Sequence, residues 1–315
     1  MPQQPQVLSS SQTRELLPMP ELIQAVGRAF DNLGAAGARI VLPAEGQDWV
    51  IMPGLTSRGG VLCKLLRVGH GDGGRTAGVP TISGIVALLD ADGKLLALLD
   101  GGTLTARRTA AVAAYATSLL SAENADVLAV FGAGSLAEEH VEAIASVREL
   151  REIRTVGRSP ERAHDFSKRM AARGFDIELG DPENALRDAN IIVTATTSEL
   201  PVLADAHVEP GTHINAMGSY KPERAEIPAA TVARSRVVVE TRESAWHEAG
   251  DLIQPRDAGL IGDDHVLAEI HEHERIMAIR PAEPDAVTLF KSVGHVALDL
   301  AALEVALGQL DGVPA

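Results

Sequence analysis

A glycine-rich turn in the middle of the chain has the spacing of a dinucleotide-binding motif. The apolar run 127–131 predicts a buried strand that leads into the turn Gly132-Ala133-Gly134-Ser135-Leu136-Ala137 and then a helix. In a GxGxxA turn the first glycine permits a tight bend, the second lets the backbone approach a pyrophosphate, and the third small residue lets helix and strand pack closely. Amide groups at the helix N-terminus bind the phosphates. We therefore predict that a dinucleotide binds at Gly132, Gly134, Ser135, Leu136 and Ala137; the alternative is a turn without a ligand.

The residues after the next predicted strand bear on which dinucleotide binds. Chains that use NAD carry an acidic residue there, which accepts hydrogen bonds from the ribose 2′-hydroxyl. This chain instead carries Arg158, Ser159 and Arg162, which favour a 2′-phosphate, although Glu161 would partly neutralise them. We predict that NADP(H) binds in preference to NAD(H). Another predicted buried strand ends in the residues Thr194, Ala195 and Thr196. These residues would face the cofactor; the alternative is an ordinary polar loop.

Three cations interrupt apolar or small-residue stretches near the N-terminus: Arg39, Lys64 and Arg108. Lys64 lies in a predicted strand with Leu62 and Leu66 on the same face, so its ammonium should point to the core, where an unpaired charge is costly. Arg108 lies in the first turns of a helix and opposes the helix dipole unless an anion is nearby. A substrate carboxylate would satisfy both. The alternative for each is an internal salt bridge with one of the 43 acidic residues.

The elements that position these residues fall into two regions. From residue 125 onward, predicted strands at 127–131, 153–156, 191–195, 212–217 and 236–240 alternate with helices at 138–147, 160–173 and 184–188. This alternation predicts a doubly wound parallel sheet. Before residue 120, strands at 50–52, 61–68, 81–89 and 94–99 predict an antiparallel sheet, with a hairpin turn at 90–93. We expect Thr103 to cap a helix over 104–120, and a last helix over 292–307 with Gly308 just past its end; only the first twelve or so residues look loose.

Length and composition exclude several classes of protein. A chain of 315 residues predicts two domains. Its net charge of −15 argues against nucleic-acid or anionic-membrane binding. Cys63 is the single cysteine, which favours a reducing, cytoplasmic compartment. We expect neither secretion nor a membrane span, because the sequence shows no leader pattern and no apolar run near ~18 residues. The histidines considered share no metal-ligand spacing, so we expect no metal site: His140, His247, His271, His273 and His295.

Several separated motifs resemble those of the ornithine cyclodeaminase/mu-crystallin family. They are Leu98-Leu99-Asp100-Gly101-Gly102-Thr103-Leu104-Thr105 with Arg108-Thr109-Ala110-Ala111, Gly132-Ala133-Gly134, Ile214-Asn215-Ala216-Met217-Gly218, Glu248-Ala249-Gly250-Asp251-Leu252 and Phe290-Lys291-Ser292-Val293-Gly294. The resemblance implies a homodimer in which a Rossmann domain (119–295) is inserted into an α+β substrate-binding and dimerisation domain (1–118 plus 296–315). It also implies that Arg39, Lys64 and Arg108 hold a substrate carboxylate, with Arg107 on another helix face, and that Met217 and Gly218 join the cofactor site.

One departure from the family bears on the reaction. The family includes ornithine cyclodeaminases, alanine dehydrogenases, reductases of cyclic imino acids and NADPH-binding crystallins. Where cyclodeaminases carry an aspartate for proton transfer, this chain has Tyr220, and a phenol with a pKa of about 10 is a poor base near neutral pH. Reduction of a protonated cyclic imine asks mainly for orientation against the nicotinamide. The resemblance thus favours NAD(P)H-dependent reduction of pyrroline-2-carboxylate or piperideine-2-carboxylate, with Lys64, Arg108 and Tyr220 as catalytic candidates.

Other readings stay open at this point. The chain could be an ornithine cyclodeaminase, an alanine dehydrogenase-type oxidoreductase, or a non-catalytic NADPH-binding crystallin-like protein. Tyr220 could also be a rim residue without a role. The presence of Arg39, Lys64 and Arg108 together weighs against a purely structural protein.

Overall fold

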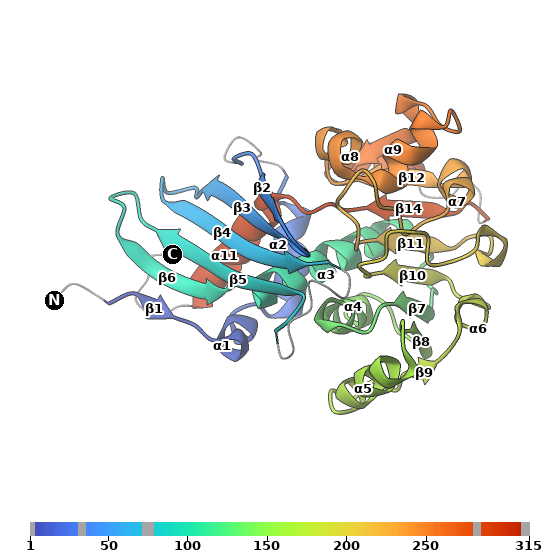
Figure 1. The fold of residues 1–315 in the computed structure, drawn as a ribbon, viewed down its shortest axis with the longest axis horizontal. Helices are drawn as coiled ribbons and strands as arrows, with labels where there is room; N and C mark the ends of the chain where they lie inside the picture. The colour runs from blue at the N-terminus through green and yellow to red at the C-terminus, as the bar shows by residue number, and fades with distance from the viewer. Residues whose placement is uncertain (1–3, 31–35, 71–78, 280–284, 310–315) are drawn as a thin grey trace. The chain divides into compact units, whose positions relative to one another are not determined.

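The chain forms two compact units in a computed structural model that describes residues 4–30, 36–70, 79–279 and 285–309 (Figure 1). Met1–Val112 with His295–Ala315 make up the first unit, and Ala113–Gly294 the second. The sequence led us to expect boundaries after residues 118 and 295. The compact units divide after Val112, which like residue 118 lies inside helix α3 (Gly101–Leu120), and after Gly294, close to the start of α11 (Val296–Gln309).

The first unit is built on a six-stranded sheet. Its strands are β1 (Gln6–Val7), β2 (Ile40–Ala44), β3 (Gln47–Leu55), β4 (Val61–Gly69), β5 (Ile82–Leu89) and β6 (Leu95–Asp100), in the order β1-β6-β5-β4-β3-β2. Strands β2 to β6 form the expected antiparallel meander, and β1 adds a parallel edge. The predicted turn at 90–93 is confirmed: Gly93 has φ +81°, and Asp90 N donates to Lys94 O at 3.0 Å.

Helices pack on one face of this sheet. They are α1 (Ser10–Glu15), α2 (Met19–Gly27), the start of α3, and α11, which packs against α2 and β3. Alternate residues of β4 are buried beneath them: Leu62, Lys64 and Leu66 are at most 3% exposed. The opposite face of the sheet carries Cys63 and Leu65, which are half-buried. The predicted orientation of Lys64 toward the core is therefore confirmed.

Three expectations about helix ends and the N-terminus are wrong. Asp100, not Thr103, caps α3: the helix begins at Gly101, and the Asp100 carboxylate accepts from Thr103 N at 2.7 Å. Helix α11 begins at Val296, four residues later than expected, and Gly308 lies within it. Residues 6–15 are not loose, because β1 pairs with β6 and Ser9 and Gln12 form a capping box at α1.

The second unit confirms the predicted Rossmann-type fold. Its parallel strands are β7 (Val127–Phe131), β8 (Glu152–Val156), β9 (Glu178–Leu179), β10 (Ile191–Thr194), β11 (His213–Ala216), β12 (Arg236–Val239), β13 (Val266–Glu269) and β14 (Thr288–Lys291). The sheet order is β13-β12-β14-β11-β10-β7-β8-β9. Strand order reverses between β7 and β10, and ligands of such sheets bind outside the carboxyl ends of the strands at that point.

Helices of the second unit differ from expectation mainly at their ends. They are α4 (Ser135–Ala145), α5 (Pro160–Ala171), α6 (Pro182–Leu186), α7 (Ala229–Arg234), α8 (Arg242–Glu248), α9 (Gly250–Asp257) and α10 (His273–Ile279). Helix α4 begins three residues earlier than predicted, directly at the glycine turn, and α6 begins two residues earlier than predicted because Asp181 caps it. The sequence missed β9, β13 and β14; the four residues of β14 are all buried, so they show no alternation of polar and apolar side chains.

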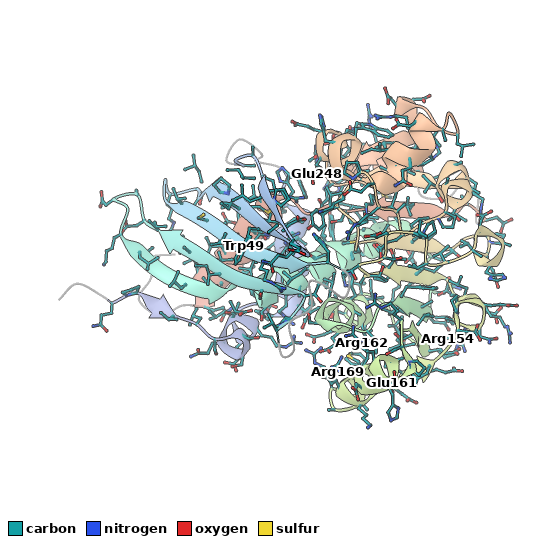
Figure 2. All side chains as sticks on the ribbon, viewed as in Figure 1. Trp49, Arg154, Glu161, Arg162, Arg169 and Glu248 are labelled. Atoms are coloured by element: carbon teal, nitrogen blue, oxygen red, sulfur yellow. The ribbon has the colours of Figure 1, made fainter. Side chains whose placement is uncertain are left out.

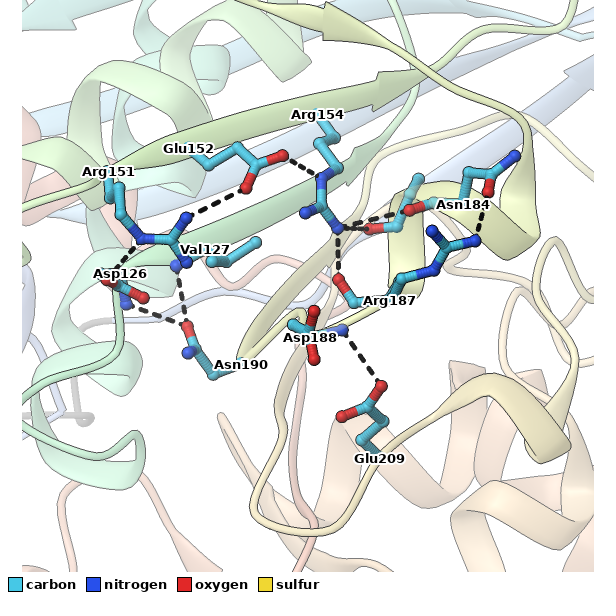
Figure 3. A network of polar contacts seen from close by, with 11 residues as sticks. Asp126, Val127, Arg151, Glu152, Arg154, Asn184, Arg187, Asp188, Asn190 and Glu209 are labelled. Atoms are coloured by element: carbon cyan, nitrogen blue, oxygen red, sulfur yellow. Dashed lines mark hydrogen bonds and ion pairs between the residues drawn. The ribbon is translucent and has the colours of Figure 1, made fainter.

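A polar network ties the strands together at their amino ends (Figure 3). The Asn190 side chain, just before β10, accepts from Asp126 N and Val127 N, each at 2.9 Å. On β8, the Arg154 guanidinium pairs with Glu152 at 2.5 Å and donates to the carbonyl of Arg187. These contacts lie at the opposite end of β7 from the glycine turn, so they support the strand register and leave the carboxyl ends open for a ligand.

Candidate functional site

The glycine turn has the shape that a bound pyrophosphate requires. Gly132 has φ +134°, and a Cβ there would lie 2.6 Å from Ala195 O, so only glycine fits. Gly134 caps α4, and apart from its own chain neighbours and helix backbone no described residue comes within 4 Å of the place a Cβ would occupy. Ala137 is fully buried. The N-terminus of the eleven-residue helix α4 is therefore open to an anion, as the spacing predicts.

The end of β8 presents basic residues at the start of α5. Arg158 and Arg162 are exposed, and Figure 2 labels Arg162 and Glu161 there. Ser159 caps the helix by accepting from Arg162 N at 3.4 Å. Hydrogen bonds from the Glu161 backbone and then the Ser159 side chain hold the pKa of the Glu161 carboxyl below its usual value. Ser159 thus has a capping role, and Arg158 and Arg162 are the exposed basic side chains at this turn.

A buried glutamate that the sequence analysis missed joins the ends of β10 and β11. The Glu226 carboxylate accepts from Thr194 Oγ1 at 3.0 Å, from Thr196 N at 2.8 Å, from Thr196 Oγ1 at 2.7 Å and from Gly218 N at 2.7 Å. Burial, helped by the nearby Asp251 charge, raises the pKa of Glu226, while Lys291 and Thr196 oppose the rise. The structure therefore brings together three residues predicted for the cofactor site and adds Glu226 beneath them.

The first unit brings the predicted cations together around another carboxylate. The Lys64 ammonium lies 2.6 Å from Asp299 Oδ2, and Arg108 Nε donates to Asp299 Oδ1 at 2.9 Å; Lys64 and Asp299 are fully buried. Arg39 is close enough for its charge to act on Lys64. Arg108 Nη1 and Thr105 Oγ1 are buried without a hydrogen-bond partner among the described residues. Asp299 is therefore the internal salt-bridge partner that the sequence analysis considered as the alternative. It leaves Arg108 Nη1 and Thr105 Oγ1 without an acceptor among the described residues, so these two donors can still bind a substrate.

The charges in this cluster perturb each other. Burial, followed by the Arg108 charge, lowers the pKa of Lys64 to about 7; Asp299 opposes this shift and Arg39 adds to it. Burial alone would raise the pKa of Asp299, but Arg108 and Lys64 outweigh it and hold that pKa below its usual value. Asp299 therefore stays ionised, and Lys64 changes charge near neutral pH.

One feature of the sequence could have identified Asp299 as a buried, paired residue. It lies three residues after Val296, within the stripe formed by Val296, Leu300, Leu303 and Leu307, and an acidic residue in an apolar stripe usually has a buried partner. Which partner it has depends on packing between α11, α3 and β4.

The remaining predicted residues lie as follows. Arg107 points away from the cluster, since its Nε donates to Leu17 O at 2.8 Å. Met217, directly after β11, is buried, and Tyr220, four residues after the strand ends, is half-buried. Among the described residues, no group of three or more His, Cys, Asp or Glu side chains could hold a metal ion. Within the same residues, no helix has the length and apolar character to cross a membrane.

Known proteins resemble this chain over nearly its whole length. The model of the ornithine cyclodeaminase/mu-crystallin family matches residues 3–311. Delta(1)-pyrroline-2-carboxylate reductase of Bacillus cereus is 33% identical over 310 residues, 93% of each chain. The chain belongs to the ornithine cyclodeaminase/mu-crystallin family.

Solved structures agree with this assignment. Delta(1)-pyrroline-2-carboxylate reductase of Thermococcus litoralis, in complex with NADH and L-proline, matches with a TM-score of 0.88 and 28% identity, covering 96% of each chain. An archaeal alanine dehydrogenase dimer with bound NAD matches with a TM-score of 0.84 and 28% identity, covering 96% of this chain and 94% of that one. The predicted family and fold class are thus confirmed.

Proposed function

We propose that this protein is an NAD(P)H-dependent reductase of a small cyclic ketimine carboxylate, such as pyrroline-2-carboxylate or piperideine-2-carboxylate, and that it forms the cyclic L-amino acid. The observation that carries the proposal is the buried Lys64–Arg108 pair, with an unsatisfied Arg108 Nη1, in a chain that also has an open dinucleotide turn. The pyrroline-2-carboxylate reductases among its relatives support the same reaction.

Separate residues bind the cofactor, bind the substrate carboxylate and supply a proton in this reaction. Gly132, Gly134 and the start of α4 hold the pyrophosphate, and the bound nicotinamide supplies the hydride. Arg108, with Arg39, binds the substrate carboxylate and fixes its orientation. Lys64, whose pKa is about 7, holds a proton at Nζ that it can pass to the nitrogen of a neutral ring imine, and hydride addition at the carbon of the resulting C=NH⁺ bond gives the amine.

An assay of NADPH oxidation against four substrates tests the proposal. We expect pyrroline-2-carboxylate or piperideine-2-carboxylate to be reduced, and pyruvate plus ammonia to react more slowly. Ornithine should release ammonia far more slowly than either imine is reduced, because Tyr220 is a poor base near neutral pH. Ornithine turnover as fast as imine reduction would establish a cyclodeaminase instead. Failure of all four substrates despite NADPH binding would favour the crystallin-like alternative.

Tyr220→Phe tests whether the phenol takes part in imine reduction. The substitution keeps the ring and removes only the hydroxyl, so we expect kcat to change by no more than a few-fold. A loss of more than about a hundredfold in kcat, or ~2.7 kcal/mol, at unchanged substrate KM would make Tyr220 a proton donor.

We propose that the cofactor preference is for NADP(H). Arg158 lies directly after β8, where the 2′-phosphate would lie, and one desolvated arginine–phosphate contact contributes about 1.5 to 3 kcal/mol, or roughly ten- to a hundredfold in affinity. Fluorescence titration should give tighter NADPH than NADH binding, and Arg158→Ala should remove the difference. The control is Arg187→Ala, an exposed arginine at the amino end of the sheet that should leave both affinities unchanged. Equal affinities in the parent protein would refute the preference.

We also propose a homodimer formed through the first unit's sheet. Ile40, Ile51, Leu65 and Ile85 lie opposite one another on β2 to β5, on the face away from Lys64. Ile40 is 49% and Ile85 45% exposed, and such a contiguous apolar row marks an association surface. The archaeal alanine dehydrogenase, whose structure is a dimer, supports a dimeric state.

Ile85→Lys should convert the dimer to a monomer in size-exclusion chromatography with light scattering, because it places a charge at the exposed β5 end of this row. Leu267→Lys, at a 39% exposed position on β13, is the control and should leave the dimer intact. A parent protein that runs as a monomer would contradict the proposal.

The single cysteine, Cys63, supports a cytoplasmic location.

A further inference from the structure

The nicotinamide half of a bound dinucleotide has to lie over the ends of β10 and β11. Strands β8, β7, β10 and β11 are consecutive neighbours in the sheet. With the 2′-phosphate at the end of β8 and the pyrophosphate at Gly134 after β7, an extended cofactor continues in the same direction. Neighbouring strands lie about 4.8 Å apart, so the cofactor reaches the segments that follow Thr194 and Ala216.

These two segments are held by one buried side chain, Glu226. Its Oε1 accepts from both the N–H and the hydroxyl of Thr196, and its Oε2 accepts from Gly218 N and the Thr194 hydroxyl. The two segments also touch directly: a Cβ on Gly218 would lie 2.3 Å from Thr196 O and 2.5 Å from Glu226 Oε1. One carboxylate thus sets the distance between the loops that follow β10 and β11.

Two further buried charges hold Glu226 in place. Asp251 Oδ1 accepts from Glu226 N at 2.7 Å and from Ile227 N at 2.9 Å. The Lys291 ammonium lies 2.8 Å from Asp251 Oδ2 and donates to Ser219 O at 2.6 Å. All three charged side chains are at most 1% exposed. Lys291 therefore fixes Ser219, the residue before Tyr220, as well, and buried charged side chains hold both Gly218 and Ser219.

We propose that Glu226, anchored by Asp251 and Lys291, is a positioning residue that sets the nicotinamide at hydride-transfer distance. The proposal rests on the proposed function, since it concerns the same cofactor site. Its physical basis is that a misplacement of about 1 Å at the reacting atoms can cost on the order of a hundredfold in rate. A carboxylate can accept from both loops at once, whereas an amide in its place presents N–H groups to one of them.

The test is Glu226→Gln, measured with NADPH and with 2′-phospho-ADP-ribose, which is the cofactor without its nicotinamide. We expect the affinity for 2′-phospho-ADP-ribose to stay within about twofold, while NADPH binds more weakly and kcat for imine reduction falls about 30- to 100-fold. Glu139→Gln is the control, because Glu139 is a buried glutamate of α4 paired with Arg173 at 3.3 Å and should leave all three values unchanged.

Other outcomes overturn the proposal. Equal weakening of both ligands would mean that Glu226 only maintains the fold, and unchanged kcat with unchanged NADPH affinity would mean that it positions nothing. Should Glu226→Gln not fold, Thr196→Val removes one of the four hydrogen bonds to Glu226 and must weaken NADPH selectively for the proposal to stand. If the parent protein reduces no imine, the proposed function fails, but the comparison of the two ligands still decides the role of Glu226.

Discussion

Arg108→Ala should lower kcat/KM for the imine by about 30- to 5000-fold, which corresponds to ~2 to 5 kcal/mol of transition-state stabilisation. The substitution removes the buried Nη1 donor that the fold leaves unsatisfied, and it leaves Asp299 with only Lys64 as a contacting cation among the described residues. NADPH affinity should stay nearly unchanged, because the glycine turn belongs to the other unit. Steady-state kinetics with a parallel cofactor titration measure both.

Lys64→Ala should show the same separation between substrate use and cofactor binding. The matched control is Arg107→Met, since Arg107 is also a buried arginine of α3 but bonds Leu17 O. We expect Arg107→Met to reduce thermal stability and to retain most of kcat/KM. A near-parental kcat/KM in Arg108→Ala or Lys64→Ala would remove that residue from the carboxylate site.

Carboxylate binding should weaken by about tenfold for each pH unit above 7. The reason is that the pKa of Lys64 is lowered to about 7 by burial and by Arg108, so the ammonium loses its proton above that pH and one positive charge leaves the site. Pyrrole-2-carboxylate is the suitable probe, because its ring nitrogen does not titrate in this range. Its dissociation constant, measured between pH 6 and 9 at saturating NADP(H), reports on the protein alone.

Two variants decide whether Lys64 causes this dependence. Lys64→Met should make binding weak and independent of pH. Asp299→Asn should lower the pH at which binding of pyrrole-2-carboxylate begins to weaken to a value below 7, because Asp299 raises the pKa of Lys64. If the dissociation constant did not change with pH in the parent protein, Lys64 would not titrate in this range. If it changed in the same way in Lys64→Met, another group would cause the dependence.

The same shift predicts how stability depends on pH. The folded-state pKa of Lys64, about 7, lies below the value of ~10.4 for an unfolded lysine, so the unfolded chain binds more protons between these limits. The free energy of unfolding should therefore receive a contribution from Lys64 that rises with pH from about 7 to about 10. Below pH 7 the full cost of burying the charge is present. Denaturant titrations of the parent and Lys64→Met, compared across this range, isolate the contribution.

The sequence alone determined the features that depend on neighbouring residues. The turn from Gly132 to Ala137, the hairpin at 90–93 and the inward side of Lys64 all follow from spacings of a few residues, because a turn or a strand is defined by adjacent backbone angles. The parallel alternation from residue 125 onward predicted the fold class for the same reason. Family motifs added the reaction class and the departure at Tyr220.

Tertiary structure alone decided which distant side chains meet. Asp299 reaches Lys64 and Arg108 from the last helix, and Asp251 and Lys291 reach Glu226 and Ser219 from 25 and 72 residues further along the chain. The position of β14 between β11 and β12 likewise follows from sheet assembly. Periodicity reports only which face of its own element a residue occupies. The partner on that face is chosen by how the elements pack, and for a buried charge this choice sets the pKa and hence the chemistry.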